Sequence, residues 1–281
     1  MAIGDSTRVN TNIAAFNALN ALKAVNRNLE ISQLRLATGL RINEVADNPA
    51  GFTISKRLDA RSRGLSVALD NVGTTKNVLS IAEGGLLNIQ KILITMKEKV
   101  TAARSDTLGP NERAAIKGEL EELSAEITDT VDETIFNDIK LIDGTYTGMS
   151  FQTGEGKADT LSFSITQSAA AASLSVDNAN LADMVSSHVD AGTALTNVNN
   201  AIADVSDILQ NIGATIARLT FKEDTLRVAI TNTDSTKSRI LDTDIAFEQL
   251  TSTRLQILQQ TATAQLAQAN VAPQNVLALF Q

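Results

Sequence analysis

The sequence contains no cysteine and no tryptophan, and its 281 residues include one histidine, one tyrosine and three prolines. Without cysteine the chain has no disulfide framework, no thiolate metal site and no cysteine nucleophile. The lone histidine, His188, excludes a paired-histidine zinc motif, and we expect it to be an ordinary surface residue of a polar stretch. Because proline is so rare, long stretches can form unbroken helix, which favours an elongated helical protein.

The balance of charge is acidic, with 24 Lys and Arg against 32 Asp and Glu and a formal net charge of −8. An acidic surface repels phosphate backbones and anionic lipids, so neither nucleic acid nor a membrane is expected as a partner. No apolar run approaches the roughly 20 residues of a membrane span, and the N-terminus lacks a signal-peptide core. If the protein is exported, we expect it to leave without a cleaved signal.

Apolar residues recur at heptad spacing in three long segments, 65–100, 116–131 and 205–230. A stripe that repeats every 3.5 residues is typical of helices that pack against other helices. Gly109-Pro110 separates the first two segments, which predicts a break there. Asn48-Pro49 predicts the start of the first helix, with Asn as the N-cap and Pro at the first helical position.

The middle of the chain has a different pattern. Met149 and Phe151, and then Leu161, Phe163 and Ile165, alternate with polar residues around the turn-forming stretch 154–157, which predicts a β-hairpin. The fragment GEGK in that turn lacks the first glycine and the hydroxyl of a phosphate-binding loop. After the hairpin, the small residues of 168–173 are expected to form a spacer at the surface.

The two ends of the chain are amphipathic with modest apolar faces, in the segments 9–29 and 255–269. Isolated helices of this kind gain little stability in water. One interpretation is that the two ends pair with each other. The other is that they fold fully only when neighbouring copies cover the remaining face.

Two long motifs at opposite ends resemble bacterial flagellin. The first runs from Val9 to Leu58 (VNTN…LRLATGLRINEVADNPAGFTISKRL), and the second from Ser238 to Phe280 (SRILDTDIAFEQL…LAQANVAPQNVLALF). The resemblance implies a mainly α fold, an elongated antiparallel coiled coil with a small β-hairpin region, paired inner terminal helices and no outer variable domains. It places a terminal-helix domain at 1–45 and 240–281. A rod follows at 46–239, with the hairpin at about 140–170 and a short variable segment at about 165–200. Met1 to Arg8 form an N-terminal extension.

The same resemblance implies a non-enzymatic, cofactor-free structural subunit of the flagellar filament, secreted and self-assembling into a helical tube used for swimming. Its implied partners are further copies of itself, the flagellar export apparatus, a secretion chaperone at the C-terminal helix, and the filament cap and hook-associated proteins. A hook-filament junction protein of the same superfamily is the nearest alternative. A flagellin with hydrolase activity is another, although the sequence has no HExxH motif.

Three groups of residues are expected to carry this function. The polymerisation seams are assigned to Ile13, Phe16, Leu22, Leu29, Leu258, Leu266, Val276, Leu277, Leu279 and Phe280. The family motifs around the end of the rod contribute Arg41, Asn43, Asp47, Arg57, Arg239, Asp242 and Asp244. The region that faces the flagellin-sensing Toll-like receptor in many flagellins maps to Thr95, Lys97, Glu98, Lys99 and Glu119. Thr95 replaces a usual arginine and Lys99 a usual leucine, so we expect reduced receptor recognition.

Overall fold

The computed structural model describes residues 11–177 and 188–278, and the side chains within 11–177 and 190–271. The chain divides into two compact units. The first combines residues 1–60 and 232–281, and the second comprises residues 61–231. The domain limits expected from the sequence, 45/46 and 239/240, fall inside the first unit.

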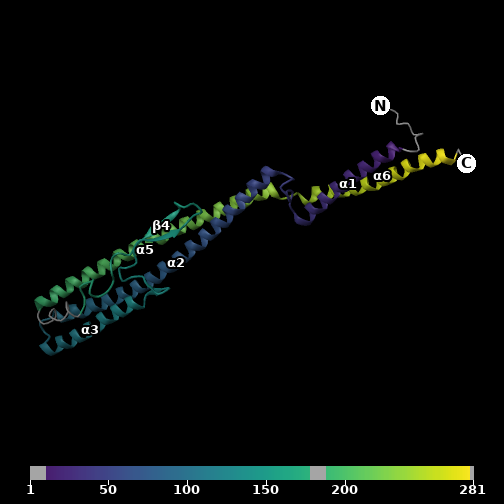
Figure 1. Cartoon of the computed structure of the whole chain (residues 1–281). Coiled ribbons are helices and arrows are strands. Elements are labelled where there is room, and N and C mark those ends of the chain that lie inside the picture. The colour runs from purple at the N-terminus through teal and green to yellow at the C-terminus, as the bar shows by residue number, and fades with distance from the viewer. Residues whose placement is uncertain (1–10, 178–187, 279–281) are drawn as a thin grey trace. The chain divides into compact units, whose positions relative to one another are not determined.

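Helices make up most of the described chain, so the expected mainly α class is confirmed (Figure 1). They are α1 (Ile13–Thr38), α2 (Pro49–Ala103), α3 (Pro110–Glu133), α5 (His188–Leu241) and α6 (Ile245–Ala278). Between α3 and α5 lie two short antiparallel hairpins, β1 (Ile135–Phe136) with β2 (Ile139–Lys140), and β3 (Met149–Gln152) with β4 (Thr160–Phe163).

The helix ends follow local sequence signals. Asn48 accepts a hydrogen bond from the Gly51 backbone N–H at 2.9 Å, and Pro49 is the first residue of α2, as predicted. The expected break at Gly109-Pro110 is also confirmed, because α3 starts at Pro110. Gly39 ends α1 with a φ of 72°, in the left-handed region that glycine enters without strain.

The core of the second unit lies along the heptad stripe of α2. Leu79, Leu86, Leu93 and Met96 are all fully buried. Contacts on α2 fix the helix directions. Lys99 pairs with Glu119 of α3, and Lys76 pairs with Glu223 of α5, while Gln90 donates to Ser206. Since the partner number on α5 falls as the α2 number rises, these two helices are antiparallel.

An 18-residue window of α2 reaches a mean hydropathy of 1.2 with at most two charges, so by length and composition this helix could cross a membrane. The expectation from the sequence considered only uninterrupted apolar runs, and it missed this window because a few polar residues interrupt it. Packing accounts for its apolar side chains, since Leu86, Ile89 and Leu93 are buried in the helical bundle.

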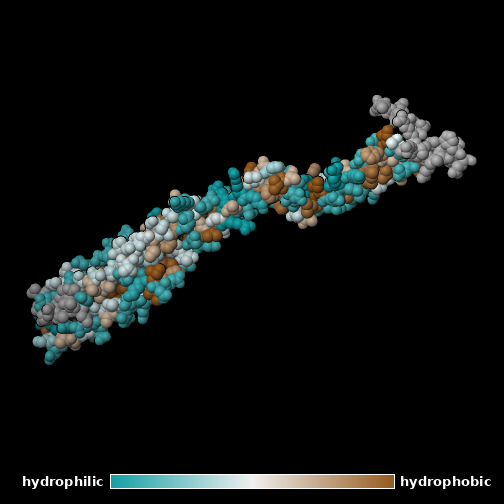
Figure 2. All heavy atoms as spheres, in the orientation of Figure 1, coloured by the Kyte–Doolittle hydropathy of each residue, from teal (hydrophilic) through white to brown (hydrophobic). Residues whose placement is uncertain are grey.

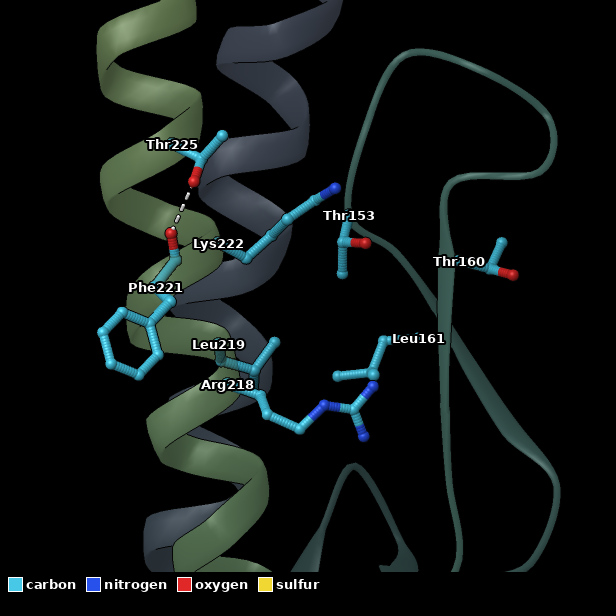
Figure 3. A pocket seen from close by; sticks show the side chains of 8 residues that line it. All are labelled: Thr153, Thr160, Leu161, Arg218, Leu219, Phe221, Lys222 and Thr225. Carbon is cyan, nitrogen blue, oxygen red and sulfur yellow. Dashed lines mark hydrogen bonds between the residues drawn. The ribbon is translucent and has the colours of Figure 1, made fainter.

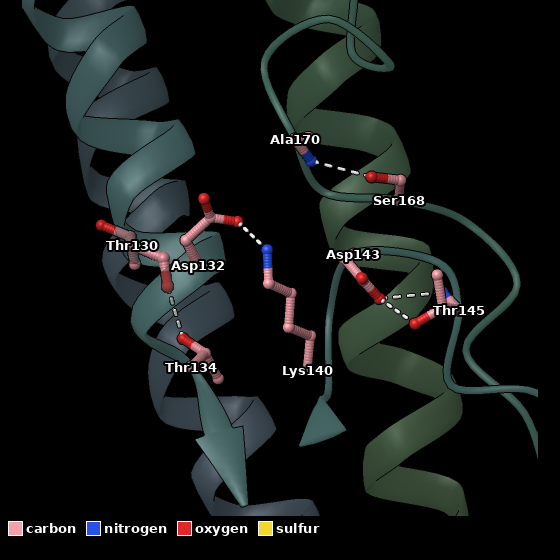
Figure 4. Close-up of polar contacts among 8 residues, drawn as sticks. All are labelled: Thr130, Asp132, Thr134, Lys140, Asp143, Thr145, Ser168 and Ala170. Atoms are coloured by element: carbon pink, nitrogen blue, oxygen red, sulfur yellow. Dashed lines mark hydrogen bonds and ion pairs between the residues drawn. The ribbon is translucent and has the colours of Figure 1, made fainter. Parts of the chain in front are cut away.

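The predicted hairpin is confirmed, with Met149 opposite Phe163 and Phe151 opposite Leu161. The β1–β2 hairpin was not predicted. Its turn residues, Asn137 and Asp138, have φ values of 49° and 62°, a pair of left-handed residues that suits a two-residue hairpin turn. The Lys140 ammonium of β2 pairs with the Asp132 carboxylate of α3 at 2.6 Å, and Figure 4 shows the two side chains pointing toward each other.

The expectation that residues 168–173 form a surface spacer holds for Ala172 and Ser173, which are exposed, but is wrong for Ala169 and Ala171. Ala169 and Ala171 are buried, and the Ala169 N–H donates to the Ile142 carbonyl oxygen at 2.9 Å. Ser168 closes the local turn by accepting from the Ala170 N–H (Figure 4). Small side chains here allow the backbone to pack closely against the core, a role that a low-complexity run does not reveal in the sequence.

Candidate assembly surfaces

The terminal helices α1 and α6 lie side by side as an antiparallel pair (Figure 1). Polar contacts link them along their length. The Asn12 amide donates to the Ala269 carbonyl oxygen at 2.7 Å, and the Gln259 amide donates to the Asn26 side-chain oxygen at 2.9 Å. These contacts join residues from opposite ends of the sequence, so pairing of the termini is an observed feature of the single chain.

Among the side chains that the structure describes, this helix pair buries very few apolar ones. On α1 only Leu29 and Ser32 are buried. Ile13 is 55% exposed, Phe16 64% and Leu258 43%. Further exposed apolar residues on the same two helices are Ile31, Leu34, Phe247, Leu250 and Ile257. Figure 2 shows apolar residues lying at the surface of this pair. Exposed apolar surface on this scale is typical of interaction sites.

The predicted seam residues therefore have different environments. Ile13, Phe16 and Leu258 are exposed, whereas Leu22 and Leu266 are half-buried and Leu29 is buried. Leu29 is thus already packed within one copy. The side chains of Val276 and Leu277, the residues Leu279 and Phe280, the extension Met1 to Arg8 and the side chain of His188 lie outside the part of the chain that the structure describes.

A short connector, residues 39–48, joins α1 to α2 and contacts the link between α5 and α6. Leu40 forms an antiparallel bridge with Asp242, and the Arg41 N–H donates to the Leu241 carbonyl oxygen. The Thr243 N–H donates to the Gly39 carbonyl oxygen at 2.9 Å. The connector is therefore held by backbone hydrogen bonds to the other end of the chain.

Acidic side chains of the family motifs order the two turns. Asp47 accepts hydrogen bonds from the Asn43 and Glu44 N–H groups. The Glu44 N–H contributes most to lowering the pKa of this carboxyl, followed by the Asn43 N–H, with a smaller effect of the Arg35 charge. Asp244 accepts from the Ala246 and Phe247 N–H groups and so caps α6.

Most of the predicted motif residues thus meet in this connector. Arg41, Asn43, Asp47, Asp242 and Asp244 all contribute hydrogen bonds or bridges there. Arg57 and Arg239 lie exposed on α2 and α5. Sequence reasoning missed Ile42, which is buried. A Cβ at Gly51 would lie 2.8 Å from the Cδ1 of Ile42. The glycine at position 51 was therefore the sequence feature that could have indicated close packing around Ile42.

Comparison with known proteins agrees with this architecture. Residues 9–147 match the family model described as the bacterial flagellin N-terminal helical region, and residues 195–280 match the bacterial flagellin C-terminal helical region. A flagellin of Halalkalibacterium halodurans is 33% identical over 267 residues, which cover 94% of this chain and 97% of that protein. A flagellin of Bacillus subtilis is also 33% identical, covering 98% of this chain and all of that protein.

The chain belongs to the bacterial flagellins. It is a structural subunit of the flagellar filament, as the resemblance of its terminal motifs implied. Among solved structures, a putative flagellar hook-associated protein from Vibrio parahaemolyticus superposes with a TM-score of 0.59 at 13% identity, covering 70% of this flagellin and all of that chain. That likeness concerns the fold alone. Within residues 11–177 and 188–278, no group of three or more His, Asp or Glu side chains could hold a metal ion.

The residues assigned from the sequence to a receptor-facing region lie on α2 and α3, in the second unit. Thr95, Lys97 and Glu98 are exposed, and the Thr95 hydroxyl donates to the Lys91 carbonyl oxygen at 3.1 Å. The Lys99 ammonium pairs with the Glu119 carboxylate at 2.5 Å. The sequence did not predict this ion pair. The Glu119 carboxylate is therefore already paired within the chain.

Proposed function

We propose that this flagellin polymerises through the exposed apolar faces of α1 and α6, in the manner expected from its terminal motifs. The exposure of Phe16 and Leu258, on a helix pair whose described side chains form almost no core, carries this proposal. Covering such side chains contributes roughly 1.5–3 kcal/mol each relative to leaving them in water. Neighbouring copies would supply the cover that the single chain lacks.

The contact would be heterologous, with one face of a subunit meeting a different face of the next. Such a contact generates an open helical polymer when its rotation does not close a ring. A swimming filament requires that geometry. We further propose that the subunit is secreted through the flagellar export apparatus with a chaperone on its C-terminal helix, and that it meets the filament cap and hook-associated proteins outside the cell.

Seeded assembly of purified protein tests the proposal. We expect Phe16→Ser and Leu258→Ser each to raise the critical concentration at least about tenfold, since about 1.4 kcal/mol of lost contact corresponds to that factor. Deletion of residues 276–281 should abolish filaments in electron micrographs and leave the circular dichroism of the monomer close to that of the full chain.

Val67→Ser is the matched control, because Val67 is 59% exposed on α2 in the other unit. It should assemble close to the wild-type critical concentration. Normal filaments from the truncated chain, or an equal defect in the Val67 variant, would contradict the assignment of the seam to the terminal helices.

A further inference from the structure

A cavity of about 400 Å³ in the second unit lies between α5 and the β3–β4 hairpin. Its lining combines two cations, Arg218 and Lys222, with the hydroxyls of Thr153, Thr160 and Thr225. In Figure 3 the side chains of Arg218 and Lys222 extend from α5 toward the hairpin side. Phe221, at the rim, is 74% exposed. The cavity is thus basic, hydroxyl-rich and open.

The two cations have no carboxylate partner within the described residues. Two acidic residues close in sequence to lining residues, Glu223 and Asp159, form contacts with other groups. Glu223 is held by Lys76 and Arg227, an arrangement that lowers its pKa, chiefly through the Lys76 hydrogen bond. Asp159 of the hairpin accepts from the Gly156 N–H. Two unpaired cations in a chain of net charge −8 favour an acidic occupant.

An acidic stripe with matching spacing lies on α3. Glu122, Glu126, Asp129 and Glu133 are all exposed and form no ion pair within the described residues. Their separations of four, three and four residues place them on one face of the helix. Arg218 and Lys222 are also four residues apart, so a facing pair such as Glu122 and Glu126 would match them. Ala125, between those two glutamates, leaves room for close approach.

Glu122 and Glu126 lie far from the cavity along the bundle of their own copy. Lys99 aligns with Glu119 and Gly85 with Thr134, whereas Lys76 aligns with Glu223. At a rise of 1.5 Å per residue along α2, these alignments separate Glu122 and Glu126 from Lys222 by about 20 to 30 Å. Complementary charge is therefore present on every subunit, displaced along the bundle, and Glu122 and Glu126 can meet the two cations only in a second copy.

We propose that the cavity lined by Arg218 and Lys222 receives the α3 acidic stripe of a neighbouring copy. This contact rests on the proposed self-assembly and adds a second, electrostatic interface to the apolar one. It is again heterologous, since the basic surface of one copy meets the acidic surface of another. Charged pairs of this kind set the register and the rate of association, and salt weakens them.

Cysteine cross-linking tests the contact directly, because the native chain contains no cysteine. The variant Lys222→Cys with Glu126→Cys should give a ladder of covalent oligomers when its filaments are oxidised. It should give no intramolecular disulfide in the monomer, since the two positions are too far apart in one copy. Filaments without a ladder would overturn the proposal. Each single-cysteine variant should stop at the dimer or below.

A charge exchange provides the second test, with the critical concentration measured in seeded assembly at low and high salt. We expect Arg218→Glu with Lys222→Glu to raise it about tenfold at low salt, and Glu122→Lys with Glu126→Lys to do the same. The quadruple variant should recover near wild-type assembly, as should an equal mixture of the two double variants. A quadruple variant no better than either double variant would overturn the proposal.

The control is Lys91→Glu with Lys97→Glu, at two exposed lysines of α2. It changes the net charge by the same amount as Arg218→Glu with Lys222→Glu. It should assemble close to wild type, and an equal defect there would show only a general charge effect and overturn the assigned contact. Failure of this proposal and failure of the terminal-helix proposal are distinguishable. If the electrostatic contact is wrong, filaments form without the cross-link. If the terminal-helix proposal is wrong, the Phe16 and Leu258 variants assemble normally.

Discussion

The Arg41 guanidinium donates a hydrogen bond to the Ile240 carbonyl oxygen at 2.8 Å, across 199 residues of sequence. Together with the Leu40–Asp242 bridge, it holds the connector against the link between α5 and α6. The two links that turn the chain into and out of the terminal helices are therefore joined to each other.

We expect Arg41→Ala to loosen this junction. A hydrogen bond from a charged donor contributes about 1.5–3 kcal/mol, and this exposed one should fall at the low end. Amide hydrogen exchange in the monomer should become faster at 39–48 and 240–244 than the already fast exchange of the native chain ends, with α2 between 79 and 96 unchanged. Arg57→Ala, on the exposed surface of α2, is the control. Unchanged exchange in the Arg41 variant would show that the backbone bridge alone holds the junction.

Residues 1–45 and 240–281 should exchange amide hydrogens quickly in the monomer and become protected in the filament. The physical reason is the small number of buried side chains on α1 and α6, which leaves local opening cheap in free energy. The α2 core around Leu86 and Leu93 should be protected in both states. Hydrogen exchange read by mass spectrometry would decide this, and equal protection of the ends in both states would contradict it.

Replacing each of two adjacent glycines of α2 by alanine should change the free energy of unfolding in opposite directions. A Cβ at Gly85 would lie 2.5 Å from the Thr134 hydroxyl oxygen, whereas nothing lies within 4 Å of one at Gly84. Gly85→Ala should therefore destabilise the second unit by about 1–3 kcal/mol through overpacking. Gly84→Ala should stabilise it by about 0.5–1 kcal/mol, because alanine has the higher helix propensity. Urea denaturation of the monomer measures both, and equal signs would contradict the packing around Gly85.

Receptor recognition of this flagellin should be weak and partly recoverable. Lys99 stands where a leucine is usual, so a charge paired with Glu119 replaces an apolar contact. Thr95 stands where an arginine is usual and lacks the several hydrogen-bond donors of a guanidinium. The variant Thr95→Arg with Lys99→Leu should signal more strongly than the native monomer in a receptor-reporter assay. An alternative is that the Lys99 methylenes keep an apolar contact while its ammonium reaches the rim. Strong native signalling that the double variant does not increase would favour that alternative.

The helices were the part of the fold that the sequence predicted best. The heptad stripe predicted the buried face of α2 because Leu79, Leu86 and Leu93 repeat over many turns, and Asn48-Pro49 marked its first residue. The β1–β2 hairpin escaped prediction since strands of two residues have no measurable period, and only Asn137-Asp138 signalled the turn. The buried alanines of 168–173 escaped it because small side chains give no hydrophobic signal.

The candidate assembly surfaces were harder to predict from the sequence. The apolar positions of α1 could be read as a stripe, but the stripe does not say that Leu29 is buried and Phe16 exposed. The Lys99–Glu119 pair and the cavity at Arg218 depend on how separate helices align. That alignment is fixed by tertiary packing, and no single segment of sequence encodes it.

The terminal helices are linked to each other by Asn12, Asn26, Ser32 and Gln259, whose side chains are neutral amides and a hydroxyl. These groups keep the same protonation state from acidic to alkaline water, and dissolved ions do not screen them as they screen charges. The second unit adds the ion pairs Lys76–Glu223 and Lys99–Glu119 around its apolar core. A cell moving from fresh water to brine would thus alter the ionic contacts of the bundle, while the pairing of the chain ends stayed the same.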